Sequence, residues 1–350
     1  MNPRRKLLAI AVIAVSGLAA AACSSSSNSS SSSSTSAAAT TAASASASPS
    51  GSINLSSVTL NVGDQKGTGA EAILTAAGLL KTLPFHVSWS DFTSGPPMLE
   101  AMASGSVDIG GVGDAPPVFA ASGGEGVEIV GARVVPGGDQ DALVVPKGST
   151  ITSITQLKGK KIAYGSGSSA NYGLLTVLTK AGLTTKDVTM VNLQPAEALS
   201  AFTSGSVDAW EIWPPYVQQV VAQDGAKVIA VGSQYGSPYS YEVASKAAVA
   251  NPAKAAAIQV YLTTLDKAYV WASAHPDSWG TAWAAATGLP ASITDVAAKV
   301  DSTKPVAIDG TITASEQNLV TQFYKAGLIP TDVNMTGYIT SQFNSSVSGS

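Results

Sequence analysis

Cysteine and histidine are scarce in this chain of 350 residues, which has one Cys and two His. The single Cys, Cys23, lies near the N-terminus, so the rest of the chain has no thiol for a disulfide or for thiol catalysis. His86 and His275 show no metal-ligand spacing, and no Gly-x-Ser-x-Gly sequence accompanies them. This scarcity argues against a metal site and against a Ser-His-Asp hydrolase, and we expect no cofactor.

Basic side chains are also few. Three of the 19 Lys and Arg residues lie at positions 4–6, which leaves 16 against 23 Asp and Glu, a formal charge of −7 for the remainder. This balance argues against nucleic acid and anionic lipid as partners. After residue 22 no apolar run is long enough to span a bilayer. The chain also lacks the G-x-x-x-x-G-K-[ST] pattern of a phosphate-binding loop.

Residues 1–22 have the pattern of an export signal. The basic positions 4–6 precede an apolar stretch at 7–22, which is shorter than the roughly 20 residues that a membrane span needs. Cys23 follows directly and resembles the acylated Cys of a bacterial lipobox, although Ala20 stands where Leu is usual. We therefore expect a lipid anchor on the outer face of the membrane. A cleaved signal with an incidental Cys is the alternative.

Residues 23–52 consist almost entirely of Ser, Ala and Thr and contain no charged side chain. Such a segment buries too little surface to offset the entropy lost on ordering, so we interpret it as a flexible tether. The remaining body of about 300 residues is long enough for two domains of ordinary size.

A sequence pattern in residues 94–108 returns about one hundred residues later, in residues 198–208. In each, a helix-patterned run ends at Ser-Gly and a short apolar strand begins with Val-Asp. A helix, a Gly cap and a buried strand are half of a parallel α/β unit. Two such units predict an α/β protein with two similar lobes. Ligands of open α/β sheets bind beyond the carboxyl ends of the strands, so a cleft between the lobes is the expected site.

Strand and helix patterns alternate from residue 58 to residue 231, and the last third is rich in helix. Two stretches, 142–147 and 231–239, are interpreted as crossings between the lobes. The first lobe then comprises residues 53–147 plus 233–350, and the second comprises residues 148–232. Two crossings form a hinge about which the lobes can close on a ligand.

Two Gly- and Ser-rich turns at helix starts are candidate anion sites. In Ser94-Gly95-Pro96-Pro97 the free amides of the first turn and the helix dipole favour negative charge, although an ordinary helix start has the same residues. The second turn contains Gly167, Ser168 and Asn171. It also fits G-x-G-x-x-[GA], but the next strand ends in Asn192-Leu193-Gln194, without the acidic residue of a dinucleotide fold.

Further candidates follow other strands of the body. Asp114 comes after Gly113, and either accepts from a ligand donor or caps the next helix. Asp64, Gln65 and Lys66 come after the first strand. Trp213, in the sequence Trp210-Glu-Ile-Trp-Pro-Pro-Tyr216, is the best candidate for an aromatic cleft wall. Further aromatic residues either join Trp213 in a cation cage or belong to the core: Trp89, Tyr235, Tyr239 and Tyr241.

Several segments taken together resemble the aliphatic sulfonate-binding proteins of ABC importers, within the nitrate, sulfonate and taurine group of solute-binding proteins. They are Ser94-Gly-Pro-Pro-Met-Leu-Glu-Ala, Gly105-Ser-Val-Asp-Ile-Gly, Gly113-Asp-Ala-Pro-Pro, Leu157-Lys-Gly-Lys-Lys, Gly205-Ser-Val-Asp-Ala-Trp and Phe323-Tyr-Lys-Ala-Gly-Leu-Ile-Pro330. The resemblance implies a two-lobe clamshell of the type II periplasmic-binding-protein kind with two hinge crossings. It also implies a monomer that delivers a small organic anion to a membrane permease without catalysis.

Carried over by position, the resemblance implies ligand contacts at Gln65, Ser94, Gly95, Asp114, Ala115, Ser168 and Asn171. One departure is that Pro214 stands where the family usually has Asp after Trp. Two alternatives stay open: the same clamshell with a cationic or heterocyclic solute in an aromatic cage, or an enzyme on this scaffold. Related desulfinases use a Cys, and the body has none.

Overall fold

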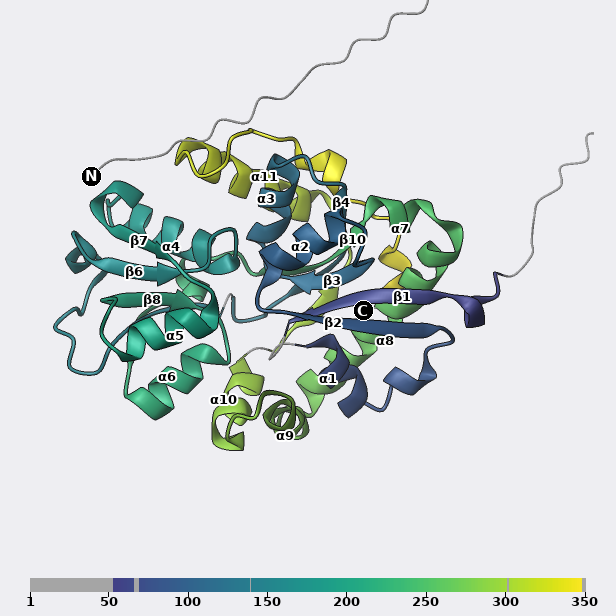
Figure 1. Ribbon diagram of the computed structural model, residues 1–350, viewed down its shortest axis with the longest axis horizontal. Coiled ribbons are helices and arrows are strands. Elements are labelled where there is room, and N and C mark those ends of the chain that lie inside the picture. Colours follow the sequence, from purple (N-terminus) through teal and green to yellow (C-terminus); the bar gives the residue numbers. More distant parts are fainter. Residues whose placement is uncertain (1–52, 66–68, 139, 301, 348–350) are drawn as a thin grey trace, which may run out of the picture. The chain divides into compact units, whose positions relative to one another are not determined.

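Two β-sheets with helices against both faces make up the part of the chain that the structure describes (Figure 1). This computed structural model describes residues 53–65, 69–138, 140–300 and 302–347. The expected signal peptide, Cys23 and the tether therefore lie outside the described residues. Residues 52–350 form one unit, within which both sheets lie.

The first sheet has six strands in the order β11-β4-β10-β3-β1-β2. The strands β1, β2 and β3 are parallel, whereas β10 runs antiparallel to β3 and β4, and β11 runs antiparallel to β4. The β1–β2 register pairs Thr59 with His86 and Gln65 with Phe92. The strands are β1 (Thr59–Gln65), β2 (His86–Phe92), β3 (Ile109–Val112), β4 (Val127–Val134), β10 (Tyr239–Ser245) and β11 (Lys304–Val306).

The second sheet has five strands in the order β7-β6-β8-β5-β9. Here β6 is parallel to β7 and β8, while β5 is antiparallel to β8 and β9. The order of three parallel strands followed by an antiparallel one thus repeats that of the first sheet. The strands are β5 (Ala142–Val145), β6 (Lys161–Tyr164), β7 (Thr189–Asn192), β8 (Ala209–Ile212) and β9 (Lys227–Val231).

Helices cover both faces of each sheet. In the first lobe one face packs against α1 and α8, and the other packs against α2 and α3. In the second lobe α4 packs against one face, and α5 and α6 pack against the other. The helices are α1 (Ala70–Ala76), α2 (Gly95–Ala103), α3 (Ala115–Ser122), α4 (Ser169–Lys180), α5 (Pro195–Thr203), α6 (Tyr216–Asp224), α7 (Lys246–Ala250), α8 (Pro252–Ala274), α9 (Pro276–Thr287), α10 (Ala291–Val300) and α11 (Gly310–Lys325).

The repeated sequence pattern forms the same local structure twice. Pro residues stand in the first turns of α2 and α5, where a missing N–H costs nothing. Each helix ends before a glycine of positive φ, 85° at Gly105 and 73° at Gly205, a conformation that side chains with a Cβ disfavour. A buried strand then follows in each lobe. The prediction of two similar α/β lobes is confirmed.

The two crossings between the lobes lie side by side. The chain leaves the first lobe after Val134 and returns to it between Val231 and Tyr239. The N–H of Gly232 donates to the carbonyl of Asp141 at 2.6 Å, and that of Val135 donates to the carbonyl of Pro238 at 2.9 Å. The outbound crossing differs from the expectation, because residues 142–145 are strand β5 of the second sheet and not a connecting segment. Their buried apolar pattern is what a central strand requires.

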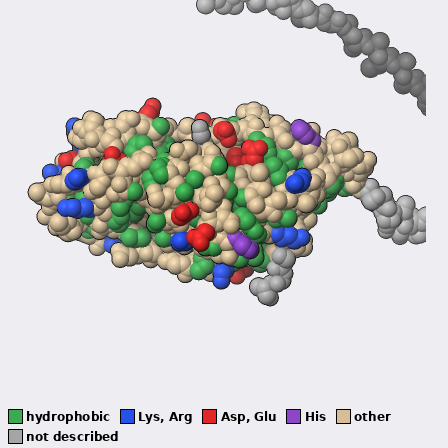
Figure 2. Space-filling model, turned by 90° about the horizontal axis from the view of Figure 1, so that it is seen from below, with side chains coloured by type: hydrophobic (Ala, Val, Ile, Leu, Met, Phe, Trp, Pro, Cys, Tyr) green, Lys and Arg blue, Asp and Glu red, His purple; other side chains and the backbone are tan. Residues whose placement is uncertain are grey.

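The C-terminal third is rich in helix, as predicted. Its helix α11 begins at Gly310, because the side chain of Asp309 accepts from the N–H groups of Thr311 and Ile312. The short edge strand β11 was not expected. No helix among the described residues is long and apolar enough to cross a membrane. On the face shown in Figure 2, basic side chains are spread out with acidic ones among them.

Candidate functional site

A cavity of about 160 Å³ lies at the carboxyl ends of β1 and β3 and is completed by residues of the second lobe. Among the residues proposed from sequence, those that line it are Asp64, Gln65, Gly95, Asp114, Ser168, Trp213 and Tyr239. Ser94, Ala115, Gly167 and Asn171 are not among the lining residues, but each is adjacent to them in the chain or belongs to the same turn. The structure therefore brings candidates from separate parts of the sequence to one place.

Three helices begin at this cavity. The N-cap residues of α2, α3 and α4 are Ser94, Asp114 and Ser168, and none of these side chains makes a capping hydrogen bond. The first-turn amides of a helix have no intrahelical acceptor, and the helix dipole makes that end attractive to negative charge. Gly95, Ser168 and Ser169 line the cavity, so two of these helix ends meet there from opposite lobes and a third adjoins them through Asp114.

The loop before α4 is held in shape by its own polar groups. The side chain of Asn171 accepts from the N–H of Gly167 at 3.0 Å, and the hydroxyl of Ser168 donates to the carbonyl of Gly165 at 2.7 Å. Gly167 has a φ of 73°, which favours glycine. A Cβ at Gly167 would lie 3.3 Å from the ring of Phe119, so this loop lies against the first lobe.

Asp114 is buried at the edge of the cavity. Among the described residues its Oδ1 atom has no hydrogen-bond partner. Burial raises the pKa of Asp114 well above its ordinary value, and the neighbouring carboxyl of Asp141 raises it further. A carboxyl group with a raised pKa keeps its proton to a higher pH, and a protonated carboxyl is a hydrogen-bond donor. In its protonated form Asp114 would face an anion without repelling it.

The lobes touch each other around the cavity. The hydroxyls of Thr93 and Ser94 in the first lobe each donate to Oε1 of Gln194 in the second, both at 2.9 Å. A Cβ at Gly113 would lie 3.0 Å from Cβ of Ser169. Ser94 was proposed as a ligand contact. Its hydroxyl makes a contact between the lobes, while Gly95, the next residue, lines the cavity.

The aromatic residues proposed for the cleft divide into two groups. Trp213 and Tyr239 line the cavity. In contrast, Tyr241 is fully buried in the first lobe, on the face of the sheet that α2 and α3 cover. Tyr235 is buried in the second lobe, where its hydroxyl donates to Glu211 at 2.8 Å. Trp89 packs against the other core of the first lobe, on the face that α1 and α8 cover. The proposed cage therefore retains two of its members at the cavity.

The position at which the family usually has Asp also lines the cavity, here as Pro214. Glu211 does not replace that missing acidic group, because it is not among the residues that line the cavity, and its side chain is completely buried within the second lobe. Burial raises the pKa of Glu211 well above its ordinary value, and Asp141 adds to the shift.

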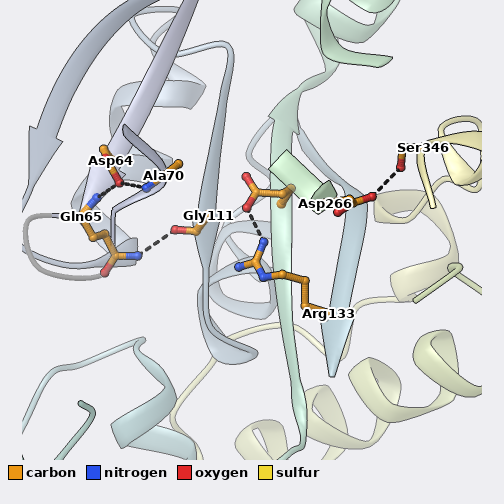
Figure 3. A network of polar contacts seen from close by, with 8 residues as sticks. Asp64, Gln65, Ala70, Gly111, Arg133, Asp266 and Ser346 are labelled. Carbon is orange, nitrogen blue, oxygen red and sulfur yellow. Dashed lines mark hydrogen bonds and ion pairs between the residues drawn. The ribbon is translucent and has the colours of Figure 1, made fainter. Parts of the chain in front are cut away.

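An ion pair that sequence analysis did not single out lies at the cavity. Nη1 of Arg133 on β4 is 2.5 Å from Oε1 of Glu242 on β10, and both residues line the cavity. The guanidinium also lies over the ring of Tyr269 on α8, 4.2 Å from its centroid. In Figure 3 the Arg133 side chain extends toward the side on which Gly111 and Gln65 lie.

Asp64 and Gln65 close the same edge of the cavity (Figure 3). The carboxylate of Asp64 accepts from the N–H groups of Gln65, Ala70 and Glu71 at 2.9 to 3.0 Å and so holds the start of α1. Burial raises the pKa of Asp64 to about 6. Nε2 of Gln65 donates to the carbonyl of Gly111 at 2.8 Å, which orients its amide. Lys66, considered with them, lies outside the described residues.

Among the described residues, no group of three or more His, Cys, Asp or Glu side chains is placed so that it could bind a metal ion. His86 and His275, the two histidines of the sequence, are both exposed. Nδ1 of His275 lies 2.8 Å from the carbonyl of Trp271 in the preceding turn, a local contact at a helix end.

The family model described as NMT1/THI5 like matches residues 94–279, a span that includes the second lobe, part of the first and most of the residues that line the cavity. The chain belongs to this family.

Relatives of this chain include proteins named for sulfonate binding. The chain is 33% identical over 285 residues to a protein of Escherichia coli (strain K12) named for binding aliphatic sulfonates, with 80% of this chain and 88% of that protein covered. Among solved structures, the alkanesulfonate-binding protein SsuA from Xanthomonas axonopodis pv. citri bound to MOPS has 30% identity and a TM-score of 0.76, covering 81% of this chain and 99% of that one.

A second solved structure, the periplasmic aliphatic sulphonate binding protein SsuA from Escherichia coli, is 32% identical with a TM-score of 0.71. It covers 81% of this chain and 92% of its own. These likenesses confirm the predicted two-lobe periplasmic-binding-protein fold and the resemblance to sulfonate-binding proteins of ABC importers.

Proposed function

We propose that this NMT1/THI5-like protein is the solute-binding component of an ABC importer and captures a small organic anion, an alkanesulfonate or a taurine-like sulfonate. The sulfonate group would lie against the helix starts at Gly95, Asp114 and Ser168. The organic part would lie against Trp213. The relatives named for sulfonate binding support this ligand class.

The observation that carries the proposal is the meeting of helix N-termini from both lobes at one cavity. Backbone amides bind an anion without a net positive charge, so an acidic protein can have such a site. A ligand bridging α2 and α4 would make its contacts only when the lobes are together. Ligand binding would therefore stabilise the closed arrangement.

The proposal extends to location and partners. The export signal and Cys23 would place the protein outside the cytoplasm as a lipid-anchored monomer, from which ligand passes to a membrane permease. We propose binding without chemistry, since the relatives cited above are binding proteins. The body has no Cys and no triad-like arrangement was identified in its sequence.

Isothermal titration of the purified protein with ethanesulfonate, butanesulfonate and taurine tests the ligand class. We expect binding to at least one of them, with a dissociation constant far below a millimolar. Absence of heat with all three at millimolar concentration would contradict the proposal. Quenching of Trp fluorescence by betaine or a pyrimidine, but not by a sulfonate, would favour the aromatic-cage alternative. If a ligand recovered from the protein is chemically changed, the protein is an enzyme.

The Asn171→Ala variant tests the site. Removal of the Asn171 side chain leaves the N–H of Gly167 without its acceptor and should loosen the loop before α4. We therefore expect sulfonate affinity to fall about tenfold. Asn334→Ala is a matched control, because Asn334 likewise accepts from a backbone N–H, that of Thr336 at 2.9 Å, but outside the cavity lining. Equal affinities in the two variants would show that the assignment of the α4 loop is wrong.

A further inference from the structure

The ion pair of Arg133 and Glu242 leaves hydrogen-bonding capacity at the cavity. Both residues line the cavity and both are more than nine-tenths buried, with exposed fractions of 7% and 3%. Nη1 of Arg133 contacts Oε1 of Glu242, but Nε of Arg133 and Oε2 of Glu242 have no hydrogen-bond partner among the described residues. Buried polar atoms without partners are uncommon, because each has lost its hydrogen bonds to water without gaining others.

Neighbouring side chains do not satisfy these two atoms. The carboxylate of Asp64 is used by the amides at the start of α1, and Oδ2 of Asp266 accepts from the hydroxyl of Ser346 at 3.1 Å. One face of the guanidinium is covered by the ring of Tyr269. The pair therefore has one cationic donor and one anionic acceptor without a partner, on two residues that line the cavity.

We propose, resting on the function proposed above, that Arg133 and Glu242 bind the far end of the ligand and select a sulfonate with an α-amino acid head. The ammonium group of that head would donate to Oε2 of Glu242, and its carboxylate would accept from Nε of Arg133. The sulfonate end keeps its place at the helix N-termini.

The arrangement of charges favours this head over simpler ones. A ligand with a plain alkyl end leaves both Nε of Arg133 and Oε2 of Glu242 without a partner. A ligand with an ammonium group alone leaves Nε of Arg133 without one. A carboxylate alone would pair with Arg133 but would lie close to Glu242, whose charge repels it. An α-amino acid head is neutral overall, as the ion pair is, so the two can meet without adding net charge to a buried place.

This selectivity is tested on the wild-type protein with three ligands that share a sulfonate and the same number of carbons between it and the carbon that differs. The probes are propanesulfonate, homotaurine, which adds a terminal ammonium, and homocysteate, which carries both ammonium and carboxylate. We expect homocysteate to bind at least about tenfold more tightly than either of the others. If homocysteate binds no more tightly than propanesulfonate, the ion pair is structural only, while the proposed function stands. If no sulfonate binds at all, both proposals fail.

Variants of the pair provide a second test. In Glu242→Gln and Arg133→Met the preference for homocysteate over propanesulfonate should fall to less than about threefold. Lys254→Met is the matched control. It breaks another partly buried ion pair, Lys254 Nζ to Asp108 Oδ1 at 2.6 Å, outside the cavity lining, and should keep the wild-type preference. A preference retained in Glu242→Gln would overturn the proposal, and if that variant fails to fold, the wild-type ligand series decides alone.

Discussion

The hydroxyl of Ser94 donates to Oε1 of Gln194 at 2.9 Å, and these two residues hold equivalent places in the two lobes. Ser94 is the N-cap of α2 and Gln194 is the N-cap of α5, one hundred residues further along the chain. Thr93 donates to the same oxygen atom. The two halves of the repeat therefore meet through corresponding residues, beside the cavity that they share.

This contact predicts a role for Gln194 in ligand retention. Gln194→Ala removes two hydrogen bonds that exist only while the lobes are together, each worth about 0.5–1.5 kcal/mol. We expect ligand to dissociate about 3–10-fold faster, with little change in melting temperature. Stopped-flow Trp fluorescence measures the rate. Gln223→Ala, which removes only a contact with Gln219 within α6, is the control and should behave as wild type. An unchanged dissociation rate in Gln194→Ala would mean that this contact does not hold the lobes together.

The close approach of Gly113 to Ser169 predicts that a side chain at Gly113 acts as a wedge. A Cβ there already lies 3.0 Å from Cβ of Ser169, and the extra methyl groups of Gly113→Val need more space than the lobes leave. We expect at least tenfold weaker binding in a protein that still folds. Gly126→Val is the control, because a Cβ at Gly126 meets nothing within 4 Å. Titration with the sulfonate measures the affinity, and circular dichroism shows whether each variant folds. Wild-type affinity in Gly113→Val would contradict a closed ligand-bound state.

The repeat could be predicted from sequence because its signals are local. A helix pattern, a Ser-Gly end and a Val-Asp strand start are contained within about a dozen residues, and each occurs twice. The helix starts at Ser94 and Ser168 were found for the same reason. Their convergence followed from the rule that ligand sites lie at the carboxyl ends of parallel strands.

Long-range pairing explains what the sequence did not show. Arg133 and Glu242 are 109 residues apart and meet only because β10 runs antiparallel beside β4. Nothing near either residue marks it as part of a site. The contact of the Ser94 hydroxyl with Gln194 was not predicted either, because the two residues lie one hundred positions apart in different lobes. The edge strand β11 has three residues, one of them Pro305, which is too short a pattern to detect.

Each lobe contains an Asp whose carboxylate accepts from a backbone N–H of a neighbouring strand, and we expect the two contacts to contribute unequally to the free energy of unfolding. The carboxylate of Asp108 accepts from the N–H of Asn61 at 2.9 Å, and that of Asp208 accepts from the N–H of Lys161 at 2.8 Å. Asp108 is more deeply buried and also pairs with Lys254. We expect Asp108→Ala to lower the free energy of unfolding by about 2–4 kcal/mol and Asp208→Ala by about 1 kcal/mol. Urea unfolding measures both, and equal losses would show that Lys254 contributes nothing.

Asp266 predicts a specific pH dependence of stability. Burial raises its pKa from 3.8 to about 6, and Arg133 only partly opposes this. In the unfolded chain the group keeps its ordinary pKa, so between about pH 4 and 6 the folded state binds more protons. The stability contributed by Asp266 therefore rises as the pH falls from 7 to 4.

The variant that isolates this effect is Asp266→Asn, which keeps the shape and removes the titration. The difference in unfolding free energy between wild type and variant should shift in favour of wild type by on the order of 2–3 kcal/mol from pH 7 to pH 4. Other buried carboxyls, such as Glu211 and Asp114, titrate in both proteins and cancel in the difference. Urea unfolding at several pH values gives the curve. A difference that is constant across this range would show that the carboxyl of Asp266 ionises as it does in water.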